Sequence, residues 1–216
     1  VLYDSLTSEA ILDPLTDCDV IDVGKRSEPR TTQEEIHELL RERARAGDRV
    51  VRLKGGDPVV FGRGGEEAEF LAEEGISFRV VPGVTSVVAA PELAGIPLTH
   101  RDISSSFTVI TGHEAAKKEE SSLDWDALSM RVDDGETLIV VMGVKRLPEY
   151  VSTLVDRGVS PDTPVAMIEK VTWQDQQTVT ATLGSIVEAA EEADIQPPAT
   201  TVIGEVVNVR DRVRER

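Results

Sequence analysis

The stretch RLKGGDP, residues 52–58, is continued by FGRGGEE at residues 61–67. The apolar, β-branched pair Val50 and Val51 precedes it and predicts a buried strand, and the acidic run from Glu66 predicts a helix. A strand that ends in a Gly-Gly turn leaves bare backbone amides at the carboxyl edge of a sheet, where open α/β sheets bind their ligands. The stretch therefore indicates an α/β fold with a ligand site at this loop; a tight structural turn is the alternative.

The composition is that of a globular chain. Its 216 residues suffice for one large or two small domains, and 40% of them are hydrophobic. The single cysteine, Cys18, excludes an intrachain disulfide and fits a reducing compartment such as the cytoplasm. No apolar run approaches the ~20 residues of a membrane span, so no membrane partner is expected.

The net charge of -17 arises from 40 acidic and 23 basic residues. This balance argues against nucleic-acid binding, which needs positive charge to neutralise phosphates. It is typical of a surface adapted to high salt, as in halophilic archaea; a chain that repels polyanions is the alternative. At ~1 M salt the Debye length is only ~3 Å, so a distant acidic surface would not repel an anionic substrate. Basic residues nevertheless gather near the motifs described below, which favours an anionic small ligand over scattered solvated charges. These residues are Lys25, Arg26, Arg52, Lys54, Arg63, His100 and Arg101.

Hydrophobic periodicity predicts an N-terminal α/β domain at residues 1–103 and a C-terminal α/β domain at residues 104–216. In the first domain strands alternate with helices, which argues for a mostly parallel sheet. The capping-box pattern Thr32-Gln33-Glu34-Glu35 predicts the start of one of these helices, and apolar residues recur at helical spacing behind it. In the second domain some strands follow each other without a helix, which indicates a mixed sheet. The strands are expected at residues 19–23, 49–53, 78–81, 107–111, 137–142, 164–168, 178–183 and 200–207.

Further motifs follow one another along the whole chain. They are Tyr3-Asp4, Val23-Gly24-Lys25-Arg26, Val81-Pro82-Gly83-Val84-Thr85-Ser86, GIPLTHRD at residues 95–102, Thr111-Gly112-His113 and Met142-Gly143. In order and spacing, together with the glycine stretch, they resemble the tetrapyrrole methylase family. The resemblance implies two α/β domains with the active-site cleft between them, and usually a homodimer. It also implies C-methylation of uroporphyrinogen III to precorrin-2 through precorrin-1, with S-adenosyl-L-methionine (SAM) as methyl donor, in sirohaem or cobalamin synthesis.

By this resemblance, Asp4 and Lys25 are the catalytic residues. Asp4 matches the family's proposed base, which takes a proton as the methylated ring rearranges; an N-cap for the next helix is the alternative. Lys25 matches the proposed proton donor, but a lysine of pKa ~10.4 is a poor acid, so a substrate-carboxylate contact or a salt bridge is the alternative. No metal is implied, because a sulfonium is already an excellent leaving group and His100 and His113 lack the neighbours of a ligand cluster.

The resemblance also implies a set of SAM contacts. The glycines permit backbone approach, and Met142 can pack on adenine or simply fill the core. Val171 departs from the family, which usually has Asn-Gly at positions 170–171; a backbone contact would survive this change, whereas a glycine-dependent conformation would not. The implied contacts are Gly55, Gly56, Asp57, Val60, Thr85, Ser86, Met142 and Val171.

Arg26, Arg63 and Arg101 are the candidates for binding substrate carboxylates, because guanidinium forks suit such groups. Each of them can instead be structural, and Arg63 can pair with Glu66 or Glu67.

One family feature is not found in the sequence, a Gly-x-Gly-Pro-Gly-Asp loop before the Tyr-Asp motif. We expect a strand and such a loop within roughly 25 residues upstream of Val1, the length that a crossover unit needs. The alternative functions are a non-catalytic tetrapyrrole-binding subunit, which the missing loop favours, and a sister methylase of a later corrin intermediate. The presence of Asp4 and Lys25 argues against the first alternative, and GGDP with FGRGG argues against the second.

Overall fold

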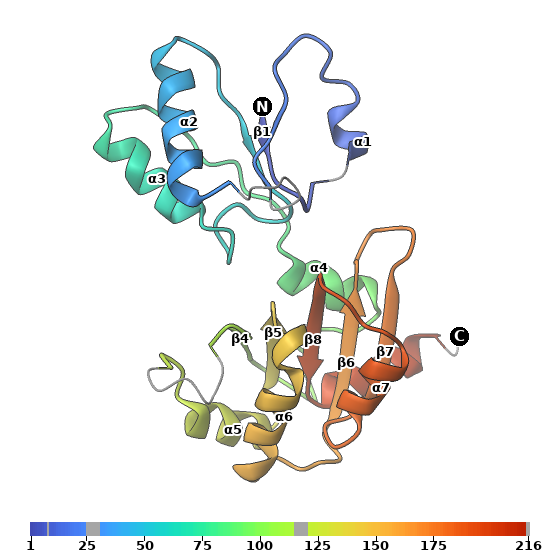
Figure 1. Ribbon diagram of the computed structural model, residues 1–216. Coiled ribbons are helices and arrows are strands. Elements are labelled where there is room, and N and C mark those ends of the chain that lie inside the picture. Colours follow the sequence, from blue (N-terminus) through green and yellow to red (C-terminus); the bar gives the residue numbers. More distant parts are fainter. Residues whose placement is uncertain (8, 25–30, 115–120, 215–216) are drawn as a thin grey trace. The chain divides into compact units, whose positions relative to one another are not determined.

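The computed structural model describes residues 1–7, 9–24, 31–114 and 121–214. The chain forms two compact units, Val1–Thr85 and Ser86–Arg216, each of which combines a sheet with helices (Figure 1). The predicted α/β class is therefore confirmed. The predicted boundary between residues 103 and 104 stays a prediction, and Lys25 and Arg26 lie outside the described residues.

The first unit contains a three-stranded parallel sheet in the order β2-β1-β3, in which Leu2 of the central strand aligns with Ile21 and Arg52. Helix α2 begins at a capping box, as its sequence predicts: Thr32 accepts from the N–H of Glu35, and the Glu35 side chain accepts from the N–H of Thr32. The elements are β1 (Leu2–Tyr3), α1 (Glu9–Leu12), β2 (Ile21–Asp22), α2 (Gln33–Arg45), β3 (Arg52–Leu53) and α3 (Gly64–Glu73). Their core contains Leu2, Val23, Ile36 and Leu40.

The strand expected at residues 78–81 is not formed within the described part of the chain. The side chains of Phe78, Val80 and Val81 are 47%, 48% and 67% exposed. Their apolar pattern is typical of a strand, but a strand also needs a neighbour for its N–H and C=O groups, and the described segment has none. The prediction was therefore wrong at this segment.

The second unit contains a five-stranded sheet in the order β4-β5-β8-β6-β7. Only β4 and β5 are paired in parallel, so the sheet is mixed, as predicted. The strands are β4 (Phe107–Thr111), β5 (Thr137–Val141), β6 (Pro164–Glu169), β7 (Gln177–Thr182) and β8 (Ala199–Ile203). The α-helices are α4 (Ser86–Leu93), α5 (Trp125–Asp133), α6 (Leu147–Asp156), α7 (Ile186–Glu192) and α8 (Val209–Arg214), and 3-10 turns occur at Val144–Arg146 and Glu205–Asn208.

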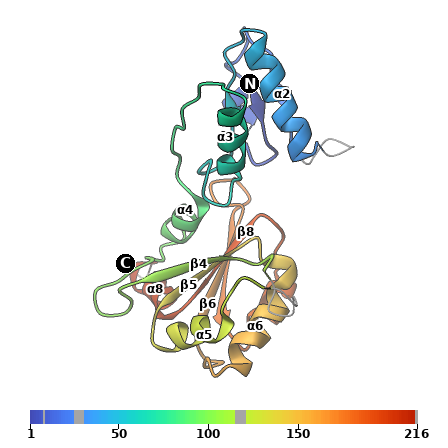
Figure 2. The same cartoon turned by 90° about the vertical axis from the view of Figure 1, so that its left-hand side faces the viewer.

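Both faces of this sheet are covered. Along β5, Leu138 and Val140 pack into one apolar cluster with residues of α5, α6 and α7, whereas Ile139 and Val141 pack into a second cluster with residues of α4. The alternation follows from the two-residue period of a strand. Figure 2 shows α4 and α6 on opposite sides of the sheet. The second unit is thus a three-layer α/β structure.

Candidate functional site

The loop that follows β3 lies at the carboxyl edge of the parallel sheet, as the sequence predicts. Gly56 has a φ of +74°, which side chains rarely tolerate. A Cβ at Gly55 would lie 2.8 Å from the Cβ of Leu6 and 3.1 Å from the carbonyl oxygen of Leu6. The fold of the first unit therefore requires glycine at both positions.

The carboxylate of Asp57 organises this loop. Its Oδ1 accepts hydrogen bonds from the N–H groups of Val59 and Val60, both at 2.9 Å, and its Oδ2 accepts from the N–H of Gly83 at 3.2 Å. The N–H groups of Val60 and Val59, and to a smaller extent that of Gly83, hold the pKa of Asp57 below its ordinary value. Asp57 therefore presents a stable negative charge at the loop.

Gly83 lies against the loop so closely that a Cβ there would be 2.2 Å from the carbonyl oxygen of Gly56. Thr85 follows two residues later, and α4 begins at Ser86. Of the predicted cofactor residues, the structure thus brings Gly56 and Asp57 into contact with Gly83, two residues before Thr85.

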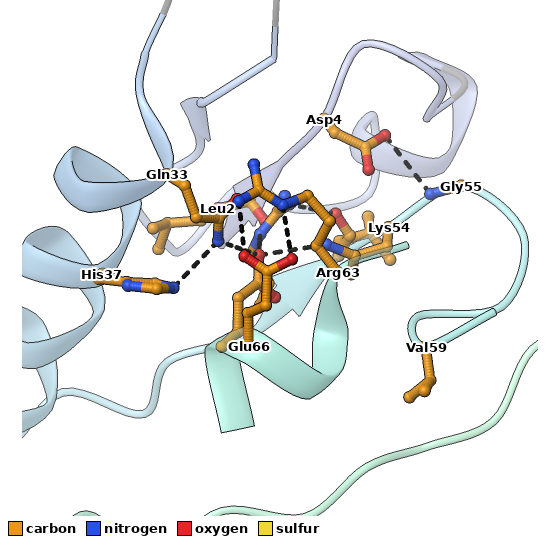
Figure 3. A network of polar contacts seen from close by, with 12 residues as sticks. Leu2, Asp4, Gln33, His37, Lys54, Gly55, Val59, Arg63 and Glu66 are labelled. Carbon is orange, nitrogen blue, oxygen red and sulfur yellow. Dashed lines mark hydrogen bonds and ion pairs between the residues drawn. The ribbon is translucent and has the colours of Figure 1, made fainter. Parts of the chain in front are cut away.

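Asp4 follows β1, and its Oδ1 faces three donors. It accepts from the N–H of Leu6 at 3.1 Å, the hydroxyl of Thr7 at 3.4 Å and the N–H of Gly55 at 3.4 Å. Figure 3 shows the last contact as a dashed line. The first two contacts close a local turn before α1, which begins only at Glu9, so Asp4 does not cap that helix. The third contact ties Asp4 to the glycine loop. Oδ2 accepts no hydrogen bond from the described residues, so one carboxylate oxygen is available for proton transfer.

Arg63 forms the ion pair that its spacing allows. Its Nε and Nη2 donate to the two carboxylate oxygens of Glu66 at 2.9 and 2.5 Å. The hydrogen bond raises the pKa of Arg63 and lowers the pKa of Glu66. Both side chains remain about half exposed, at 55% and 51%, so the pair stays accessible to a ligand.

Arg101 is exposed in a turn of the second unit that hydrogen bonds between His100 and Ser104 close at 2.8 and 3.0 Å. Its predicted role in substrate binding stays a prediction, as do the roles of Lys25 and Arg26.

Met142 and Val171 come from parallel strands of the second unit. β5 and β6 both pair antiparallel with β8, so they run in the same direction and end at the same edge of the sheet. Met142 directly follows β5, has a φ of +55° and is 45% exposed. A strained backbone that presents an exposed apolar side chain is more consistent with a contact surface than with core filling.

The loop after β6 keeps a strained backbone without glycine. Lys170 and Thr172 have φ values of +47° and +73°, and Val171 between them is not among the described residues with positive φ. Val171 packs against the α4-side cluster of the sheet. The family usually has glycine at position 171, but in this chain the backbone of Val171 does not adopt a conformation that requires glycine.

Two features had no counterpart among the predicted site residues. The first is a close approach of two glycines, because a Cβ at Gly112 would lie 2.3 Å from the Cα of Gly143. Gly143 in turn packs on Tyr150, whose buried hydroxyl donates to Thr201 at 3.0 Å. Both glycines belong to recognised motifs, which was the only signal in the sequence.

The second feature is Glu67 on α3, which is 5% exposed. Its Oε1 accepts from Gln33, Arg52 and Lys54. The sequence signal was weak, because Glu67 reads as one more acidic residue of a solvated helix.

No group of three or more His, Cys, Asp or Glu within the described ranges could hold a metal ion. Likewise, no helix of the described part is long and apolar enough to cross a membrane.

Comparisons with known proteins give consistent matches. The family model for Tetrapyrrole (Corrin/Porphyrin) Methylases matches residues 1–187. A protein of Methanosarcina barkeri named S-adenosyl-L-methionine-dependent uroporphyrinogen III methyltransferase is 50% identical over 100% of this chain and 84% of its own length.

Solved structures of similar fold include uroporphyrin-III C-methyl transferase from Thermus thermophilus complexed with S-adenosyl homocysteine. It is 40% identical, with a TM-score of 0.76, and the match covers 96% of this chain and 86% of that chain. A cobalt precorrin-4 methyltransferase has a TM-score of 0.80 at 26% identity, over 95% of this chain and 83% of its own. The fold is therefore shared by methylases named for different substrates, and the sequence identity is higher to the Thermus enzyme.

Proposed function

The chain belongs to the tetrapyrrole methylase family, and we propose that it is a SAM-dependent transferase that C-methylates uroporphyrinogen III to precorrin-2 through precorrin-1. The observation that carries the proposal is the glycine loop held by an ionised Asp57, in a chain that is 50% identical to a relative named for this substrate. The product would enter sirohaem or cobalamin synthesis.

The residues of this chain fit SAM as a ligand. When bound, SAM supplies a methyl group on a positively charged sulfonium. The hydrogen-bonded Asp57 stays ionised at neutral pH, and its charge favours a cationic ligand. Gly55 and Gly56 leave the backbone uncovered by side chains. Met142 offers an exposed, polarizable surface for adenine.

The main task of the residues is to position the reacting groups. Methyl transfer needs the ring carbon, the methyl group and the sulfur in line, and such alignment can contribute ~7–11 kcal/mol to catalysis. In this proposal the loop residues Gly55 to Val60, with Thr85, Ser86 and Val171, fix the donor. Arg26, Arg63 and Arg101 bind the carboxylates of the tetrapyrrole, and the bidentate geometry that Arg63 makes with Glu66 is the geometry suited to a substrate carboxylate.

Proton transfer completes the reaction. As the carbon–carbon bond forms, a ring proton must leave, and we assign its acceptance to the oxygen of Asp4 that no described donor occupies. Lys25 is assigned to donate a proton to the tetrapyrrole during its rearrangement, which is balanced by a second proton that the tetrapyrrole loses, so that each methyl transfer releases one proton overall. A homodimer in the cytoplasm is part of the same proposal, and sedimentation of the purified protein tests the dimer.

Incubation of the full-length protein with SAM and uroporphyrinogen III tests the function. We expect S-adenosylhomocysteine release together with the absorbance change of precorrin-2 formation. Release of S-adenosylhomocysteine only with a later corrin intermediate would instead identify a sister methylase, for which the similarity in fold to the cobalt precorrin-4 enzyme is the supporting observation. Tetrapyrrole binding without any S-adenosylhomocysteine release would indicate a non-catalytic subunit.

A further inference from the structure

Glu67 is a buried carboxylate that connects the glycine loop to the helices of the first unit. Its Oε1 lies 3.3 Å from Nε2 of Gln33, 3.2 Å from Nε of Arg52 and 3.1 Å from Nζ of Lys54. These donors come from the first residue of α2, from β3 and from the residue that precedes Gly55. Figure 3 labels Gln33, His37 and Lys54 of this network and shows the contact of Gly55 with Asp4 beside it. A single oxygen atom thus joins three segments of the unit.

The charges in this network are poorly solvated. The side chains of Glu67, Lys54 and Arg52 are only 7%, 8% and 13% exposed. Two cations share one carboxylate, so its removal would leave two buried positive charges next to each other without compensation. Such a contact holds its partners firmly, because neither cation can turn to water without reorganising the unit.

Lys54 links this network to the loop. It is the last residue before Gly55, and its ammonium group is anchored to α3 through Glu67. On the other side of the loop, the N–H of Gly55 donates to Asp4. The backbone that leaves β3 is therefore held from both sides, by Lys54 and Glu67 on one and by Asp4 on the other.

Fastening α2 to α3 does not require Glu67. Glu74 at the end of α3 already bridges the helices, since its carboxylate lies 2.5 Å from Nη2 of Arg45 and 3.7 Å from Nη1 of Arg41. Glu74 therefore also pairs with two cations, but it lies at the other end of α3 from Glu67. Within the described part of the chain, no hydrogen bond or ion pair joins the Glu74 side chain to the loop. The specific feature of Glu67 is its contact with Lys54.

We propose that Glu67 is a positioning residue for cofactor binding, which acts through Lys54 to fix the Gly55–Asp57 loop. The proposal rests on the proposed function, because it takes this loop to be part of the SAM site. Glu67 itself need not touch the cofactor.

Titration of the full-length protein with S-adenosylhomocysteine, followed by calorimetry, tests the proposal. Glu67→Gln keeps the shape and removes the charge, and we expect its Kd to rise at least about tenfold, because a small misplacement of a binding group is costly. Lys54→Met leaves Arg52 and Glu67 as a balanced pair, so it should fold and show a similar loss. The double variant should lose no more affinity than either single variant, since both act through one contact.

Glu74→Gln is the matched control, and it should lower the melting temperature without changing the Kd. A folded Glu67→Gln with unchanged affinity would overturn the proposal. If Glu67→Gln fails to fold, Lys54→Met decides, and unchanged affinity there would overturn the proposal equally. Additive losses in the double variant would show that Glu67 does not act through Lys54. Absence of binding by the wild-type protein would instead refute the proposed function, so the two failures are distinguishable.

Discussion

Replacement of Gly83 by alanine would push apart the two backbone segments of the candidate site. The added Cβ would lie 2.2 Å from the carbonyl oxygen and 3.0 Å from the carbonyl carbon of Gly56, and 3.4 Å from the Cα of Asp57. These are all backbone atoms, which cannot move aside as the end of a flexible side chain can. The hydrogen bond from the N–H of Gly83 to Asp57 would lengthen at the same time.

The expected magnitude follows from the cost of overpacking. Inserting a methyl group where the backbone must shift costs about 1–3 kcal/mol. In a chain of this size that lowers the melting temperature by roughly 2–12 °C. We expect a larger effect on ligand binding, with the Kd for S-adenosylhomocysteine raised at least about tenfold, or about 1.4 kcal/mol, because the displaced segments include the predicted cofactor residues.

Gly65→Ala is the matched control, because a Cβ at Gly65 meets no atom within 4 Å. This variant lies in α3 and should be as stable as the wild type, or more stable by up to about 1 kcal/mol. Thermal melts and calorimetric titrations of both variants give the comparison. If Gly83→Ala binds S-adenosylhomocysteine as tightly as Gly65→Ala does, the contact between the loop and Gly83 does not shape the cofactor site.

Three other outcomes are expected. Asp4→Asn should keep its hydrogen bonds as an acceptor but lose turnover by about 10²–10⁴-fold without loss of cofactor affinity; precorrin-2 formation within a few-fold of wild type would remove Asp4 from the catalytic residues. The melting temperature should rise between low salt and ~2 M KCl, because ions screen the self-repulsion of a chain with net charge -17, and a flat or falling curve would refute adaptation to salt. Burial raises the pKa of Glu169, but the N–H of Gln196 and the side chains of Lys170 and Gln177 lower it more, so the folded pKa lies below the ordinary value. The contribution of the Glu169 carboxylate to stability is therefore complete above the unfolded pKa of about 4.3 and is lost as the pH falls through the folded pKa. Glu169→Gln should have a lower melting temperature than the wild type at pH 7, and the melting temperatures of the two proteins should converge in acid. A difference in melting temperature that stays constant down to pH 3 would contradict this stabilising role of the Glu169 carboxylate.

Local signals in the sequence were sufficient for most of the fold. The capping box at Thr32 and the helical spacing behind it depend only on neighbouring residues, and they correctly placed the start of α2. The apolar run at residues 137–142 likewise predicted a strand, and the structure forms β5 there. The apolar residues at 78–81 failed as a prediction, because a strand depends on a hydrogen-bonded partner that composition does not reveal.

By itself, the sequence determined the type of the fold and the family, and it predicted the loop at which a ligand would bind, because these inferences depend on periodicity, glycine positions and motif order. Only the tertiary structure decided which groups hold that loop. The bonds from Gly83 to Asp57 and from Gly55 to Asp4 join residues 26 and 51 positions apart, and the contact of Lys54 with Glu67 depends on how α3 packs on the sheet. Such contacts arise only when distant segments meet in three dimensions. For Lys54 and Glu67, folding also brings charges into poorly solvated surroundings, where only a specific partner can compensate them.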